Sequence, residues 1–278
     1  MPELPFVCSA TPLSSTDFNG VVAALGVDPA SIWALLTVES GKAGFLPDRR
    51  PPILFERAVF RKRTNGQYDA TNPGISAPTW GGYSGGTLEY GRLAEAYALN
   101  PDAALQSASW GISQVMGFNY SAAGYATVSS YVADCCGSEA AQLKAFESFL
   151  EHQGIASALR EHNWTTVATR YNGTGQVEVY AERLKENFDK LSDPTQQPDI
   201  SVRAAQLYLN YLFHATGNAA YNPGGIDGQI GTPGRSRTLS ALNAFQTDQG
   251  LPVTTAVDDG VLASLAAAQV APANLLLA

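Results

Sequence analysis

The sequence has few of the residues that build cross-links or metal centres. Three cysteines and three histidines occur in 278 residues, without the spacing of a metal site: Cys8, Cys135, Cys136, His152, His162 and His214. Neighbouring cysteines rarely bond each other, so we expect no disulfide framework and a reducing compartment. No G-x-S-x-G motif of a serine hydrolase is present. The sequence therefore predicts neither a metal nor a cofactor.

A long apolar run and an excess of basic charge are also lacking. No stretch of 18 apolar residues exists, so we expect no stable membrane insertion. The first ten residues, MPELPFVCSA, have neither the basic segment nor the apolar run of a signal peptide. A net charge of −8 excludes general nucleic-acid binding, because phosphate backbones repel an acidic surface.

The chain is rich enough in apolar residues to form a packed core, and long enough for two domains. Hydrophobic residues make up 45% and charged residues 15%, which excludes a disordered chain. A polar segment with two prolines, at 193–198, predicts a linker. We expect a domain at 1–192 and a second at 199–278, each folding independently.

The first region has mainly the periodicity of helices. Apolar residues recur on one face in segments 17–25, 29–40, 88–98, 139–160, 164–170 and 176–190. Segment 64–87 is rich in glycine, proline and asparagine, and we expect a long loop there with room for a β-hairpin. The second region predicts a compact module of three helices, beginning near residues 202, 236 and 258. The predicted fold class is therefore mainly α, with a small loop and hairpin region.

Glu39 occupies an unusual place on the second of these helices. Ile32, Leu35, Leu36 and Glu39 share one face, so the carboxyl follows three aliphatic side chains into the edge of the core. Burial and the helix C-terminus both disfavour its charged form and raise its pKa. A carboxyl kept protonated near neutral pH suits a glycosidase acid. The alternative is a glutamate that points to solvent or pairs with Arg49 or Arg50.

The sequence around Glu39 resembles one family, the phage-type N-acetylmuramidases that act as endolysins. The resemblance covers about residues 12–190 and includes VESG at 38–41, GFL at 44–46, RPPILFER at 50–57, residues 69–76, GGY at 81–83, SASWGISQVMGFNY at 107–120 and RYNG at 170–173. It implies a lysozyme-like catalytic domain in which Glu39 is the general acid.

The second carboxylate is less clearly marked. Glu56, between apolar residues, is the best candidate for a base or nucleophile, and Asp48 is the next. The alternative for Glu56 is an ion pair with one of the basic residues at 49–63. The family often has a histidine two positions after this glutamate, but Ala58 stands there, so no role is assigned to that position.

The resemblance also implies residues that line the substrate cleft. Gly111 is expected to allow close backbone approach, and Gln114 to bind an acetamido group or a sugar hydroxyl. Tyr171 and Asn172 are expected on the opposite wall. Asp48 is a further substrate-binding candidate, and Trp110 is expected in the core. Aromatic candidates for stacking on sugars are Trp80, Tyr83, Phe118 and Tyr120.

The second region is similar to a three-helix peptidoglycan-binding module. The matching pieces are IDGQIG at 226–231, a helix ending in Phe245-Gln246, and GLPV at 250–253. An additional TPGR at 232–235 lengthens the segment before the helix. The resemblance does not identify the surface that binds glycan.

Together these features predict a muramidase that hydrolyses the β-1,4 bond between N-acetylmuramic acid and N-acetylglucosamine, causing host cell lysis. A lytic transglycosylase would use the same glutamate but form an anhydro product. A non-enzymatic wall-binding protein is the third alternative. The expected partner is peptidoglycan and the expected state a monomer. Without an export signal, we expect synthesis in the host cytoplasm and access to the wall through a holin-type lesion.

Overall fold

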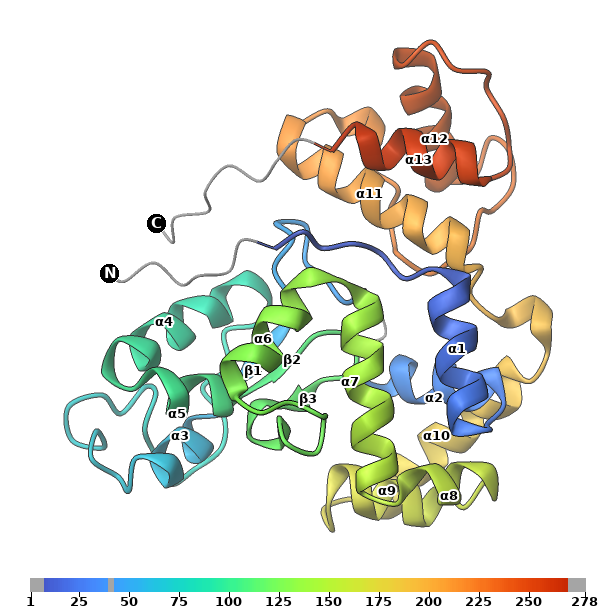
Figure 1. The fold of residues 1–278 in the computed structure, drawn as a ribbon. Coiled ribbons are helices and arrows are strands. Elements are labelled where there is room, and N and C mark those ends of the chain that lie inside the picture. The colour runs from blue at the N-terminus through green and yellow to red at the C-terminus, as the bar shows by residue number, and fades with distance from the viewer. Residues whose placement is uncertain (1–7, 40–42, 270–278) are drawn as a thin grey trace.

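The computed structural model describes residues 8–39 and 43–269. Figure 1 shows helices around a small sheet, with the last three helices gathered at one side of the molecule, at the top of the view. The chain is therefore mainly helical with a small β-sheet, as the sequence predicts. Among the described residues no single helix is long and apolar enough to cross a membrane; only α1 and α2 together pass that test, as a pair bent by 108°.

The first two helices carry the residues that the sequence singled out. Helix α1 is Ser15–Leu25, and its N-cap Ser14 accepts a hydrogen bond from the Asp17 backbone at 3.1 Å. Helix α2 is Pro29–Glu39, and α10, Val177–Leu191, packs along it. The sequence predicts this helix as far as residue 40, and residues 40–42 lie outside the described part of the chain. Glu39 is thus at the end of a helix whose other residues are largely buried.

The sheet is antiparallel and has three short strands, β1 at Ile53–Phe55, β2 at Ala108–Trp110 and β3 at Val115–Met116. Ile53 pairs with Trp110, which pairs with Val115. The hairpin therefore lies at 108–116 and not in segment 64–87, where a hairpin was expected. That segment forms turns and ends in the short helix η1 at Gly86–Leu88. Trp110 is fully buried, which confirms its place in the core.

Further helices surround the sheet: α3 Arg57–Arg63, α4 Glu89–Leu99, α5 Pro101–Gln106, η2 Gly117–Asn119, α6 Val128–Gly137, α7 Glu139–His152, α8 Ile155–Arg160 and α9 Trp164–Asn172. The prediction of one helix over 139–160 was wrong, because α7 and α8 are separate. Gly154 has a φ of 63°, a left-handed conformation that breaks the helix and that glycine adopts without strain. Ile155 follows Leu150 by five residues, which is not a helical repeat, so the apolar face changes at the break and the prediction overlooked this shift.

The last region contains η3 Pro194–Gln196, α11 Ile200–Thr216, η4 Ala219–Tyr221, α12 Arg237–Asp248 and α13 Asp259–Ala267. Three helices after residue 199 agree with the sequence. Leu209, Leu242, Phe245 and Leu265 form a second, smaller core between them. The IDGQIG motif shapes the loop before α12, where Asp227 accepts hydrogen bonds from Gln206 and from the Gln229 backbone at 2.8 and 2.9 Å.

Side chains of α11 also enter the core of the first region. Arg203 forms a bidentate ion pair with Glu139, at 2.6 and 2.7 Å, and both side chains are almost fully buried. Leu207 and Tyr211 belong to the larger core, and the Tyr211 hydroxyl donates to the Ala10 carbonyl at 3.0 Å. The two regions are therefore in close contact across the linker.

Candidate active site

Glu39 lines a cleft with a volume of about 680 Å³. Phe45, Leu46, Pro47 and Pro52 form apolar parts of its wall, and Gln114 is a polar part. Asn210 of α11 and the segment 224–227 also line it. The cleft thus combines two carboxyl groups, those of Glu39 and Asp227, with apolar surface and polar groups, as a sugar-binding site requires.

The Glu39 carboxyl accepts a hydrogen bond from the Tyr180 hydroxyl of α10. Burial raises the pKa of Glu39 to about 7, although the Tyr180 hydrogen bond opposes the shift by favouring the charged form. The alternative, an ion pair with Arg49 or Arg50, is not formed among the described residues. Arg50 pairs with Asp48, and Arg49 donates to Gln269 at 3.0 Å. Near neutral pH, Glu39 therefore exists partly as a protonated acid beside a hydroxyl donor.

Tyr180 was not singled out by the sequence. It lies on the face of α10 with Ala181 and Leu184, which are also buried, so the pattern marks it as an ordinary core residue. Tyr171 stacks against it, with ring centroids 6.4 Å apart, and donates its hydroxyl to the Ser113 carbonyl. These two tyrosines brace the wall behind Glu39. Asn172, the last residue of α9, is exposed and does not line the cleft.

Gln114 lines the cleft as expected, but protein groups occupy its side-chain amide. The amide nitrogen donates to the carbonyls of Pro52 and Gly111, at 3.1 and 2.8 Å, and the oxygen accepts from Ser109 at 2.7 Å. These bonds fix the strand ends at the cleft floor. The geometry therefore favours a role for Gln114 in shaping the site, alongside the expected contact with sugar.

The glycine at 111 makes room for a protein side chain. A Cβ atom there would lie 2.5 Å from the Gln142 amide carbon. Gln142 is buried, accepts from the Ile112 backbone at 2.8 Å and donates to the Gly44 and Cys135 carbonyls. The close approach predicted for Gly111 is thus toward Gln142. Sequence reasoning missed Gln142, because its position on α7 is that of an ordinary helix residue.

Glu56 does not line the cleft that contains Glu39. It precedes α3, is 8% exposed, and both carboxyl oxygens accept from the Tyr83 hydroxyl, at 3.0 and 3.1 Å. Burial raises its pKa, while the Tyr83 hydrogen bond and the charge of Arg92 lower it. No ion pair joins Glu56 to the basic residues at 49–63 among the described residues.

The remaining candidates are dispersed. Asp48 is buried and binds Arg50, which suits a structural role. Phe118 is partly exposed beneath the Arg63 guanidinium, 5.4 Å from the ring centroid. Trp80 and Tyr83 are exposed on the segment before η1, and Tyr120 packs against the core. None of these side chains lines the Glu39 cleft.

The comparisons with known proteins identify the family of the chain. The family model of N-acetylmuramidases matches residues 28–192. The crystal structure of the Burkholderia AP3 phage endolysin is 38% identical, with a TM-score of 0.60 over 66% of this chain and 72% of that one. No curated protein matches. The family match spans α2 to the end of α10 and so includes Glu39, Gln114 and Tyr180.

Proposed function

Because the chain belongs to the N-acetylmuramidase family, a family of peptidoglycan glycosidases, we propose that it cleaves the β-1,4 bond between N-acetylmuramic acid and N-acetylglucosamine. The observation that supports this proposal is the Glu39 carboxyl, which is half-buried in a cleft and has its pKa raised to about 7. The likeness to a phage endolysin supports action on a host cell wall. Synthesis in the host cytoplasm, holin-type release and a monomeric state belong to the same proposal.

The proposed reaction begins with proton transfer from Glu39 to the glycosidic oxygen. Loss of the proton leaves a carboxylate away from bulk water, and the Tyr180 hydroxyl stabilises that anion by donating to it. The bond between the anomeric carbon of the muramic residue and the protonated oxygen breaks, and the second sugar leaves with a free hydroxyl. A water molecule adds to the anomeric carbon and gives its proton to a carboxylate or to solvent. Either Glu56 assists this water as the second carboxylate, or the reaction proceeds with water and no second carboxylate. The absence of Glu56 from the cleft wall favours the second route.

Replacement of Glu39 tests the proposal. Glu39→Gln keeps the size of the side chain and an acceptor for Tyr180 but cannot donate a carboxyl proton. We expect release of reducing ends from purified peptidoglycan to fall by about 10²-fold or more, because general acids contribute this much. Glu182→Gln, an exposed change on α10, is the matched control and should keep full activity. Unimpaired lysis by Glu39→Gln would contradict the assignment.

The products separate hydrolysis from its nearest alternative. A lytic transglycosylase would transfer the bond to the muramic 6-hydroxyl and release an anhydro sugar, one water lighter than the hydrolysis product. Mass spectrometry of released muropeptides should show the hydrated form. A protein that binds walls but releases no reducing ends would instead support the non-enzymatic alternative.

We also propose that residues 1–192 form the catalytic domain, 193–198 the linker and 199–278 a peptidoglycan-binding domain. The support is the IDGQIG segment and the three-helix core around Phe245. The isolated segment 199–278 should sediment with insoluble peptidoglycan and release nothing from it. Retention of that segment in the supernatant would contradict the binding role.

A further inference from the structure

The wall of the Glu39 cleft is not built by the family-matched residues alone. Asn210 and the segment Gly224–Asp227 line it, and they lie beyond residue 192, where the family match ends. Ile226 packs against the core of the first region. The last region therefore reaches the cleft that contains the proposed acid.

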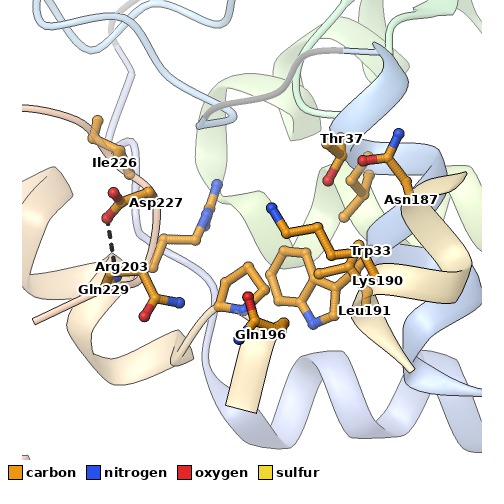
Figure 2. A pocket seen from close by; sticks show the side chains of 12 residues that line it. Trp33, Thr37, Asn187, Lys190, Leu191, Gln196, Arg203, Ile226, Asp227 and Gln229 are labelled. Atoms are coloured by element: carbon orange, nitrogen blue, oxygen red, sulfur yellow. Dashed lines mark hydrogen bonds between the residues drawn. The ribbon is translucent and has the colours of Figure 1, made fainter. Parts of the chain in front are cut away.

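The same segment borders a second hollow of about 440 Å³. Figure 2 shows Trp33 and Lys190, from α2 and α10, on one side of it, and Arg203, Asp227 and Gln229 on the other. Ile226 and Asp227 line both hollows. The loop that contains Gly224–Asp227 thus lies along the junction of the two regions, and the cleft with Glu39 is on one side of it.

The loop is held in place by a buried hydrogen-bond network. Gln206, which is 1% exposed, donates to Asp227 and Thr238 and accepts from the Gly228 backbone at 2.8 Å. Gly228 has a φ of 71°, and a Cβ atom there would lie 2.7 Å from Pro198. A loop fixed in this way can present groups to a ligand without a large loss of conformational entropy on binding.

The groups that this wall offers suit a sugar. The Asn210 side-chain amide forms no hydrogen bond within the described part of the chain, and it can both donate and accept. Gly224 and Gly225 are exposed and bring backbone close to the cleft without side chains in between. Apolar surface from Phe45 and Pro47 completes the site.

Contacts between the regions lead directly to the cleft. The Glu139 carboxylate binds Arg203 of α11 and also accepts from the Gly44 backbone amide at 2.5 Å. Gly44 lies between Ala43 and Phe45, which both line the cleft. One buried carboxylate therefore joins the last region to the cleft wall.

We propose that Asn210 and the segment Gly224–Asp227 form part of the substrate-binding cleft and contact the glycan strand during catalysis. The last region then takes part in recognition at the reacting bond, in addition to any attachment to the wall. This inference rests on the proposed function, because it assigns the occupant of the same cleft. The ligand class is a β-1,4-linked strand of N-acetylated hexosamines.

Gly225→Trp in the full chain tests the inference. Gly225 has no positive φ, and only Asp227 lies within 4 Å of a Cβ atom built there, at 4.0 Å, so a large side chain can enter the cleft without backbone strain. The probe is a soluble tetrasaccharide with two disaccharide repeats of peptidoglycan. We expect kcat/KM for this substrate to fall by about tenfold or more.

Two matched variants accompany it. Gly225→Ala tests the backbone change without bulk and should remain within about twofold of wild type. Gly20→Trp makes the same substitution on the exposed face of α1, where no atom lies within 4 Å, and should leave kcat/KM unchanged. Asn210→Ala should raise KM several-fold with little change in kcat, because it removes a binding group and not the acid.

Several outcomes would overturn the inference. Unchanged kcat/KM in Gly225→Trp, with Tm at the wild-type value, would show that no glycan passes this wall. A rise in activity would show instead that the last region obstructs the cleft. Binding of the tetrasaccharide to Glu39→Gln protein, measured by calorimetry, separates this inference from the proposed function. Weaker binding after adding Gly225→Trp supports the cleft assignment even if wild type proves inactive.

Discussion

Glu39 in the cleft is half-buried and Glu139 at the junction of the two regions is fully buried, and their surroundings shift the two pKa values in opposite directions. Glu39 has one neutral donor, Tyr180, and burial raises its pKa to about 7. Burial would also raise the pKa of Glu139, but the charge of Arg203 and its hydrogen bonds, together with backbone amides, outweigh it and lower the pKa.

The difference shows how partner groups assign roles to identical side chains. A neutral partner leaves Glu39 able to hold and release a proton near pH 7, which is a property of a catalytic acid. A bidentate arginine keeps Glu139 charged and joins two segments 64 residues apart. The predictions below change one partner at a time.

The largest loss of stability is expected when the charge of Arg203, at the junction of the two regions, is removed. Arg203→Met leaves a buried carboxylate without its ion-pair partner, and we expect the free energy of unfolding to fall by about 3–5 kcal/mol. Urea denaturation measures this change. Arg235→Met, an exposed substitution in the same region, is the control and should have little effect.

Removing the charge of Glu139 as well tests whether the unpaired carboxylate causes this loss of stability. In the double variant Glu139→Gln with Arg203→Met, no unpaired charge remains, so part of the lost stability should return. A fragment that ends at residue 194 also lacks Arg203 and should be at least as destabilised as Arg203→Met. A fragment as stable as the full chain would show that the first region does not depend on this ion pair.

The protonation of Glu39 predicts how activity depends on pH. Because the acid must be protonated, kcat should fall as the pH rises through about 7. Tyr180→Phe removes the hydrogen bond that lowers this pKa, so the fall should move to higher pH, with kcat reduced roughly three- to tenfold by loss of a donor to the anion. Tyr68→Phe, which removes a hydroxyl bound to the Leu99 carbonyl, should leave the pH profile unchanged.

The free energy of unfolding should also depend on the protonation of Glu39. The pKa of Glu39 is raised from 4.5 to about 7, so the folded protein binds its proton more tightly than the unfolded chain. This contribution is complete below pH 4.5 and is lost as the pH rises through 7. The Tm difference between wild type and Glu39→Gln should therefore change across this interval, and a constant difference would contradict the raised pKa.

The smallest effect is expected at Glu56. Glu56→Gln keeps an acceptor for the Tyr83 hydroxyl, and the side chain does not line the Glu39 cleft. We expect kcat on the tetrasaccharide to fall by less than about tenfold, below the 10²–10⁴ typical of a general base. A loss of 10³ or more, with an unchanged Tm, would establish Glu56 as the second catalytic carboxylate.

Much of the fold followed from local patterns. The spacing of Ile32, Leu35 and Leu36 placed Glu39 on a buried helix face, and the three helices after residue 199 appeared where their periodicity predicted them. The break at Gly154 was missed, although the apolar face changes there, because Ile155 lies five residues after Leu150. The hairpin was assigned to the turn-rich segment 64–87, whereas its short strands at 108–116 carry too few residues for a clear alternation.

The sequence by itself determined most of the helices and the family, and it marked Glu39 as the candidate acid, because these depend on residues near one another in the chain. Tertiary structure decided the partners of each carboxyl: Tyr180 for Glu39 lies 141 residues away, and Arg203 for Glu139 lies 64 away. It also brought Asn210 and Gly225 to the cleft. A side chain's pKa depends on burial and neighbouring charges in space, and no spacing along one helix specifies those neighbours.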